Sequence, residues 1–139
     1  MRTGLRSYLE DILTDYPYLD MHIAKREQEI LYPDNVYKDE NIGGGRGGRI
    51  SNPTASKALT ISQDEKIETF KRYRDAIEKI INHSDPVTNQ IIREYYFTRP
   101  RTKTWDGIAL SVNYSKRHCL NLRDSFFTRL ALELGLMKH

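Results

Sequence analysis

The residues best suited to chemistry lie in one basic stretch near the C-terminus, residues 116–123. Lys116 and Arg117 carry cations that can contact phosphate groups, and the amide of Asn121 can pair with the edge of an adenine base. The sequence places these side chains on the first turns of a helix that Ser115 would cap. Base-reading helices carry such residues at their N-terminal ends, so the stretch points to double-stranded DNA as a ligand.

Two helices joined by a tight turn would hold this stretch. Thr104 can cap the first helix, Val112–Ser115 supplies the turn, and the second helix runs to Gly135. The first helix has an apolar face made by Trp105, Ile108 and Ala109. In the second helix apolar residues recur every three or four positions and predict a buried stripe of Cys119, Leu122, Phe126, Leu130 and Leu134. This pattern predicts a helix-turn-helix.

The buried stripe turns the other residues of the second helix outward. The predicted DNA-contacting residues there are Ser115, Lys116, Arg117, His118, Leu120, Asn121 and Arg123. The preceding loop adds Arg99, Arg101 and Lys103 as predicted phosphate contacts. The alternative is that the basic face is only solvated, because any basic amphipathic helix after a turn shows the same pattern.

Patterns typical of enzymes and metal sites do not accompany this stretch. The four histidines have no spacing that would place two on one helix face, and Cys119 is the single cysteine. The sequence contains no nucleophile elbow, Walker loop or dinucleotide-binding turn. We therefore expect a protein that is not an enzyme and that uses neither a cofactor nor a metal ion.

Charge and composition narrow the class further. The 139 residues carry a net charge of +3, and 38% of them are hydrophobic, which allows one modest core. Residues 85–139 hold nine basic and five acidic side chains, so the positive charge gathers near the C-terminus. No signal peptide and no apolar run long enough for a bilayer is present. We expect a soluble protein of a reducing compartment, without a membrane partner.

The chain before residue 84 has the pattern of helices around a Gly-rich connector. Pro17 marks a break after a first amphipathic helix, and five of the eight glycines fall within residues 33–53. The long helix that follows carries an apolar seam formed by Phe70, Tyr73, Ile77 and Ile80. This seam favours pairing with the N-terminal helices, and the alternative partner is the same seam of a second copy in a homodimer.

The predicted fold is therefore all-α, with a helical arm joined to a C-terminal DNA-binding domain. Its parts are N-terminal helices in residues 1–32, a flexible connector in 33–53, a long helix in 54–83 and the helix-turn-helix domain in 84–139.

Residues 104–123 resemble the region-four helix-turn-helix of bacterial sigma factors. The resemblance rests on Trp105, Asp106, Ile108, Val112, Asn113, Ser115, Cys119, Asn121 and Leu122. It implies DNA contacts by Lys116, Arg117, His118, Leu120 and Asn121. Leu120 departs from the family's pattern, because an apolar side chain stands there in place of a basic one.

The whole chain resembles the RinA-type activators of late genes in phages of low-GC Gram-positive bacteria. The matching segments are Asp15–Pro17, Asn41–Gly44, Ala76–Asn82, Glu94–Phe97 and Arg129–Gly135, in the family's order. The resemblance implies a phage or prophage protein that binds promoter DNA in the cytoplasm of the bacterial host and activates packaging and morphogenesis genes.

Two other functions stay open at this point. The first is a phage DNA-packaging recognition subunit, which would form large rings. The second is a helical interaction protein that binds RNA polymerase or a regulator. Polymerase is also a candidate partner of the activator itself.

Overall fold

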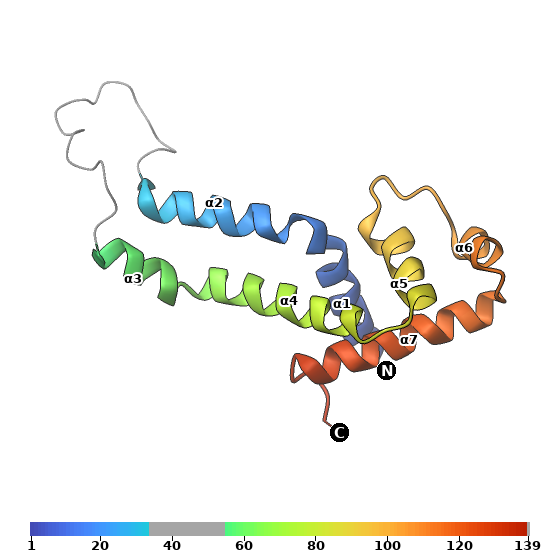
Figure 1. Cartoon of the computed structure of the whole chain (residues 1–139). Helices are drawn as coiled ribbons and strands as arrows, with labels where there is room; N and C mark the ends of the chain where they lie inside the picture. Colours follow the sequence, from blue (N-terminus) through green and yellow to red (C-terminus); the bar gives the residue numbers. More distant parts are fainter. Residues whose placement is uncertain (34–54, 139) are drawn as a thin grey trace. The chain divides into compact units, whose positions relative to one another are not determined.

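The computed structural model describes residues 1–33 and 55–138, and within these ranges every regular element is helical (Figure 1). This confirms the all-α prediction. The elements are α1 (Thr3–Asp15), the 3₁₀ turn η1 (Tyr16–Tyr18), α2 (Leu19–Leu31), α3 (Ala55–Gln63), α4 (Glu65–Asn82), α5 (Pro86–Ile92), the π-helix η5 (Arg93–Phe97), α6 (Trp105–Val112) and α7 (Lys116–Glu133). Apart from Pro33, the expected connector lies outside the described residues.

The helices form two compact units. The first unit combines residues 1–18 with the chain from residue 72 onward, and the second unit spans residues 19–71. Helix α4 begins in the second unit and ends in the first. From the sequence we expected a boundary between the helical arm and a C-terminal domain at residues 83 and 84. The sequence pattern does not reveal that α1 and the end of α4 pack on the C-terminal helices.

The core of the first unit joins four segments that are distant in the sequence. Its buried side chains are Leu9, Ile12 and Leu13 of α1, Ala76, Ile77 and Ile80 of α4, Ile92 and Tyr96 of the α5–η5 segment, and Phe126, Phe127, Leu130, Ala131 and Leu134 of α7. Helix α7 therefore packs on both α1 and α4. Removal of these apolar surfaces from water is the main force that holds α1 against the C-terminal helices.

One buried tyrosine ties α1 to η5 through a polar contact. The Tyr96 hydroxyl donates a hydrogen bond of 2.8 Å to Glu10 Oε2. Burial, together with this carboxylate, raises the pKa of Tyr96 above its ordinary value. The phenol consequently stays neutral and keeps its proton for the hydrogen bond.

Helix α5 begins after a capping aspartate. Asp85 caps it by accepting from Thr88 N at 3.1 Å and from Thr88 Oγ1 at 2.7 Å, and Pro86 occupies the first turn. The helix continues into the wider π-helix η5, which the sequence pattern did not predict. This segment turns Tyr96 into the core.

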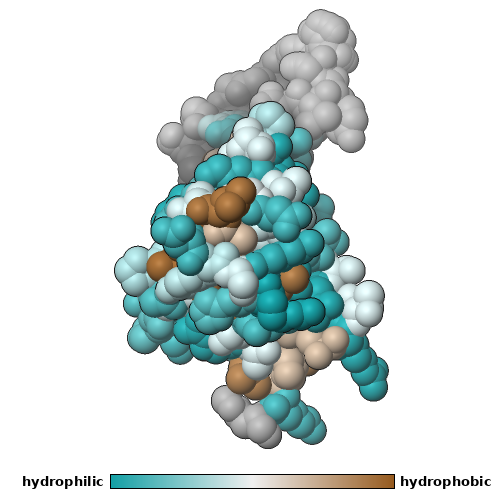
Figure 2. Space-filling view, turned by 90° about the vertical axis from the view of Figure 1, so that its right-hand side faces the viewer, coloured by the Kyte–Doolittle hydropathy of each residue, from teal (hydrophilic) through white to brown (hydrophobic). Residues whose placement is uncertain are grey.

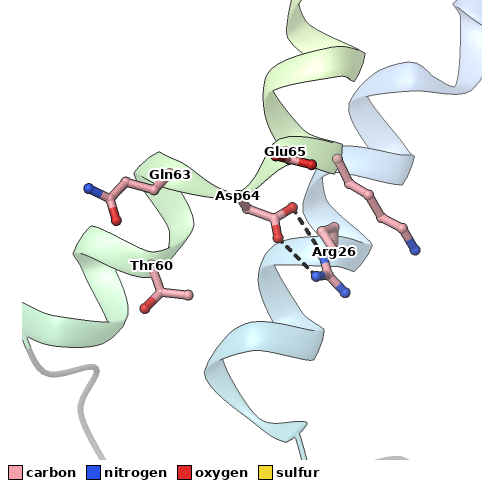
Figure 3. A pocket seen from close by; sticks show the side chains of 6 residues that line it. Arg26, Thr60, Gln63, Asp64 and Glu65 are labelled. Atoms are coloured by element: carbon pink, nitrogen blue, oxygen red, sulfur yellow. Dashed lines mark hydrogen bonds and ion pairs between the residues drawn. The ribbon is translucent and has the colours of Figure 1, made fainter.

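The second unit contains a break that the sequence pattern did not predict. The expected long helix of residues 54–83 is divided into α3 and α4 at Asp64. The Asp64 carboxylate accepts from Ile67 N at 3.1 Å and so caps α4. It also accepts from Arg26 Nη2 at 2.8 Å and from Nε at 3.1 Å (Figure 3). An acid at this position already carries the capping signal in the sequence.

The ion pair stands beside an open pocket and fastens α2 to the α3–α4 junction. Thr60, Gln63, Glu65 and Lys66 complete the lining of this pocket (Figure 3). Hydrogen bonds from Arg26 outweigh the effect of burial and lower the pKa of Asp64. Among the described residues of this unit, the buried large apolar side chains are Leu19, Ile23 and Ile67.

We expect the second unit to lose local stability on acidification. Because the pKa of Asp64 is lowered in the folded state, its contribution is present above the ordinary carboxyl range and is lost as pH falls through the folded pKa. Asp64→Asn keeps an oxygen for the cap but removes the charge. Hydrogen exchange at the start of α4, compared between parent and variant at each pH, should show a protection gap at pH 7 that closes in acid. Equal protection at pH 7 would contradict this role of the ion pair.

Candidate nucleic-acid interface

Helix α6 is short and is defined at both ends by local hydrogen bonds. Thr104 caps it by accepting from Gly107 N at 3.2 Å. At its other end Asn113 adopts a left-handed conformation with φ of 65°, and Tyr114 N donates to Ala109 O at 3.1 Å. Asparagine tolerates this conformation better than most residues, so the chain can turn sharply here.

Helix α7 begins directly after this turn. Ser115 Oγ accepts from His118 N at 3.0 Å and caps the helix, as predicted. The helix ends at Glu133, Gly135 just beyond it has a φ of 75°, and Leu136 N donates to Ala131 O at 2.8 Å. The apolar stripe predicted for this helix is buried, with Leu122 only partly so.

A second cluster of buried side chains fixes α5, α6 and the start of α7 together. It consists of Ile91, Ile108, Ala109 and Cys119, and Val87, Val112 and Leu122 pack around it. Burial also raises the pKa of the Cys119 thiol, so this residue serves as a small apolar side chain. Because the cluster holds one side of α7, the opposite side faces solvent.

The structure brings most of the predicted contact residues onto this exposed side. Ser115, Lys116, Arg117, His118 and Asn121 are exposed, and Leu120 is half-buried. Lys116 Nζ lies 3.9 Å from Asp106 Oδ1 on α6, and the His118 ring packs edge-on against Tyr114. The side chains of Arg117 and Asn121 make no hydrogen bond or ion pair within the described residues.

Arg123 is separated from this group. Its side chain is only 12% exposed, and its guanidinium lies 5.4 Å from the Trp105 ring centre and 5.6 Å from that of Phe127. Its Nη2 also donates to Asp124 Oδ1 at 2.8 Å. The Arg123 guanidinium therefore connects α7 with Trp105 of α6.

The loop between η5 and α6 presents the three remaining candidates. Arg99 is exposed. Arg101 lies 3.9 Å above the Tyr95 ring, which itself stacks on Trp105 with 4.2 Å between ring centres. The sequence pattern did not predict this stack, and the aromatic residues at 95 and 105 are its only signal in the sequence.

Lys103 anchors the same loop to η5. Its Nζ donates to Glu94 Oε1 at 3.1 Å. Burial alone would raise the pKa of Glu94, but hydrogen bonds from Gln90 and Lys103 lower it overall. The loop is therefore held in place, and two of its three cations already have partners inside the protein.

The surface seen from the side of α6 is mostly hydrophilic, with small separate apolar patches (Figure 2). The most exposed large apolar side chain among the described residues is Leu110 of α6, at 82%. Residues 1–33 and 55–138 contain no group of three or more metal-ligating side chains placed to hold an ion. No helix in these ranges is long and apolar enough to span a membrane.

Comparison with known proteins places the chain in a family. Residues 6–131 match the family described as "Protein of unknown function (DUF722)". The chain belongs to this family. It is also 29% identical over 127 residues to a protein of Staphylococcus phage phi11 named "Transcriptional activator rinA", a match that covers 91% of this chain and 88% of that protein. These two matches confirm the resemblance to RinA-type proteins. No solved structure matches the chain.

We expect the cap on α7 to be measurable without DNA. Ser115→Ala removes the acceptor for His118 N and should lower the free energy of unfolding of the first unit by about 1 kcal/mol. Ser115→Asn restores an acceptor and should keep most of the stability. Urea denaturation followed by circular dichroism measures both variants. If alanine and asparagine behaved alike, the cap would not contribute to stability.

Proposed function

We propose that the chain is a sequence-specific DNA-binding transcriptional activator of phage or prophage late genes, those for packaging and morphogenesis. It would act in the cytoplasm of the bacterial host, and the proposal assigns it no catalytic step. The name of the phage phi11 relative supports the activator class. The observation that carries the DNA-binding role is the exposure of Arg117 and Asn121 without partners at the start of a rigidly held helix.

The geometry of residues 104–133 suits a helix-turn-helix. In such a unit the second helix enters the major groove, and residues near its N-terminus reach the base edges. In α7 this role falls to Arg117 and Asn121, which lie four residues apart and so share one face. Asn121 is suited to an adenine edge, whereas Arg117 can pair with guanine or with a phosphate.

The neighbouring residues would fix the position of α7 on the duplex. Lys116, His118 and Ser115 are exposed beside Arg117 and suit phosphate contacts. The loop cations Arg99, Arg101 and Lys103 would add phosphate contacts at a second place, and the anchoring of two of them reduces the entropy lost on binding. Leu120 has no charge and supplies none of these contacts.

Arg123 takes a different role in this proposal. Because its guanidinium packs over Trp105 and Phe127, it positions α7 against α6 and does not contact phosphate itself. For partners we propose promoter DNA and host RNA polymerase, with a homodimer as the form that binds two half-sites.

Binding to DNA should depend strongly on salt, because cations that meet phosphates release condensed counterions. If two copies make roughly 6–10 phosphate contacts, the affinity should fall by about 10³- to 10⁵-fold between about 50 and 200 mM salt. Fluorescence anisotropy titrations at several salt concentrations measure the slope. An affinity that is indifferent to salt would contradict a phosphate-based interface.

Exposed and buried residues of α7 should respond to substitution in opposite ways. Arg117→Ala and Asn121→Ala should leave the melting temperature nearly unchanged, while each lost base contact weakens binding by about 1–3 kcal/mol. Phe126 is fully buried, so Phe126→Ala should cost roughly 3–5 kcal/mol of stability by leaving a cavity.

The test is a titration of each variant against the promoter and a scrambled duplex, with melting curves in parallel. Asn121→Ala should also change the base preferred at one position, whereas a phosphate-contacting Lys116 should affect all sequences alike when replaced. If Arg117→Ala and Asn121→Ala both bound the promoter like the parent, the proposed recognition face would be wrong.

A further inference from the structure

The start of α1 lies against the middle of α7 within the first unit (Figure 1). Arg6 Nη2 is 3.9 Å from Asp124 Oδ1 of α7. One helical turn further along α1, Glu10 accepts the hydrogen bond from Tyr96. These two contacts fix which face of α1 is turned toward α7 and η5.

Helical spacing extends this face to Arg2. Residues four apart lie on the same side of a helix, so Arg6 and Glu10 share one side of α1, and Arg2, the N-cap residue before Thr3, continues their spacing by one turn. Glu10 is held by η5 and Arg6 by α7. Arg2 is exposed and has no ion pair within the described residues.

The same spacing places Asp124 beside the proposed recognition face of α7. Asp124 follows Asn121 by three residues and Arg117 by seven, which puts the three on neighbouring positions of one face. Arg6 therefore reaches α7 at the border of the surface that would meet DNA. Arg6 of α1 lies next to that border, and Arg2 precedes it by about one helical turn.

The contact between Arg6 and Asp124 is easily exchanged. The side chains are 34% and 44% exposed, and an ion pair of 3.9 Å in such surroundings contributes little in water. Arg123 donates to the same Asp124 oxygen at 2.8 Å. If Arg6 turned to another anion, Asp124 would still be neutralised by Arg123, so no carboxylate would be left unpaired close to DNA.

We propose that Arg2 and Arg6 form a second cationic edge of the DNA interface, where their guanidinium groups bind backbone phosphates beside α7. The inference rests on the proposed DNA-binding function and deepens it. Guanidinium groups fit phosphate oxygens with two parallel hydrogen bonds, which makes arginine suited to this position. The first helix of the chain would thereby contact the same duplex that α7 reads.

The experiment compares Arg2→Ala and Arg6→Ala with a matched control, Lys138→Ala, in the 139-residue chain without added N-terminal residues. Lys138 is also exposed and without an ion pair in the described chain, but it follows the far end of α7. A random-sequence duplex is titrated by fluorescence anisotropy at several salt concentrations. Losing one phosphate contact should reduce the slope of log affinity against log salt by about 1, and weaken binding roughly tenfold at about 50 mM salt.

Each outcome decides the inference. A reduced slope for both arginine variants and an unchanged slope for Lys138→Ala would support it. If the parent binds DNA and the arginine variants keep its salt slope, the inference is overturned while the proposed function stands. The same holds if Lys138→Ala reduces the salt slope as much as the arginine variants do. If the parent binds no duplex, the proposed function itself fails. Melting curves check that Arg6→Ala is folded, and Arg2, exposed at the helix start, provides a variant that does not disturb the core.

Discussion

The first unit depends on the burial of one side of α7. Near the start of the helix, Cys119 packs with α5 and α6, and further along, Phe126 and Leu130 pack with α1, α4 and η5. Helix α7 therefore contributes to both clusters, and each cluster separately fixes the rotation of the helix about its own axis. Since a rotation would expose both sets of apolar side chains, the opposite face of α7 must stay in solvent. The proposed recognition residues take their position from this constraint.

Polar contacts at the edges of these clusters fix how the packed helices are positioned relative to one another. The buried Tyr96 finds its acceptor in Glu10, so α1 has a defined position along η5. Arg123 covers Trp105 with its planar guanidinium and keeps a carboxylate partner, which makes burial of its charge tolerable. The first contact ties α1 to η5, and the second ties α7 to the start of α6. The arrangement favours a preorganised surface over one that forms only on binding.

Local signals in the sequence were sufficient for the helix ends near the candidate site. The caps at Thr104 and Ser115 and the turn at Asn113 depend on neighbours within a few residues, so they could be predicted. Arg123 could have been recognised too, because it follows Cys119 by four residues and thus borders the buried stripe. The docking of α1 on α7 could not, because nothing local in an amphipathic helix says which distant surface will cover it. The division at Asp64 was missed because uninterrupted helical spacing conceals a capping acid.

Net charge also says less about a DNA interface than the placement of the individual cations. Residues 85–139 carry nine basic side chains, yet Lys103, Lys116 and Arg123 already face acidic partners. The other six have no acidic partner in the described chain, and three of these, Arg99, Arg101 and Arg117, lie at the candidate site. One copy therefore offers these three cations directly, and phosphate contacts by Lys103 or Lys116 would require their ion pairs to exchange acid for phosphate. In the proposed function, two copies on two half-sites would double the number of contacts without any new charge in the fold.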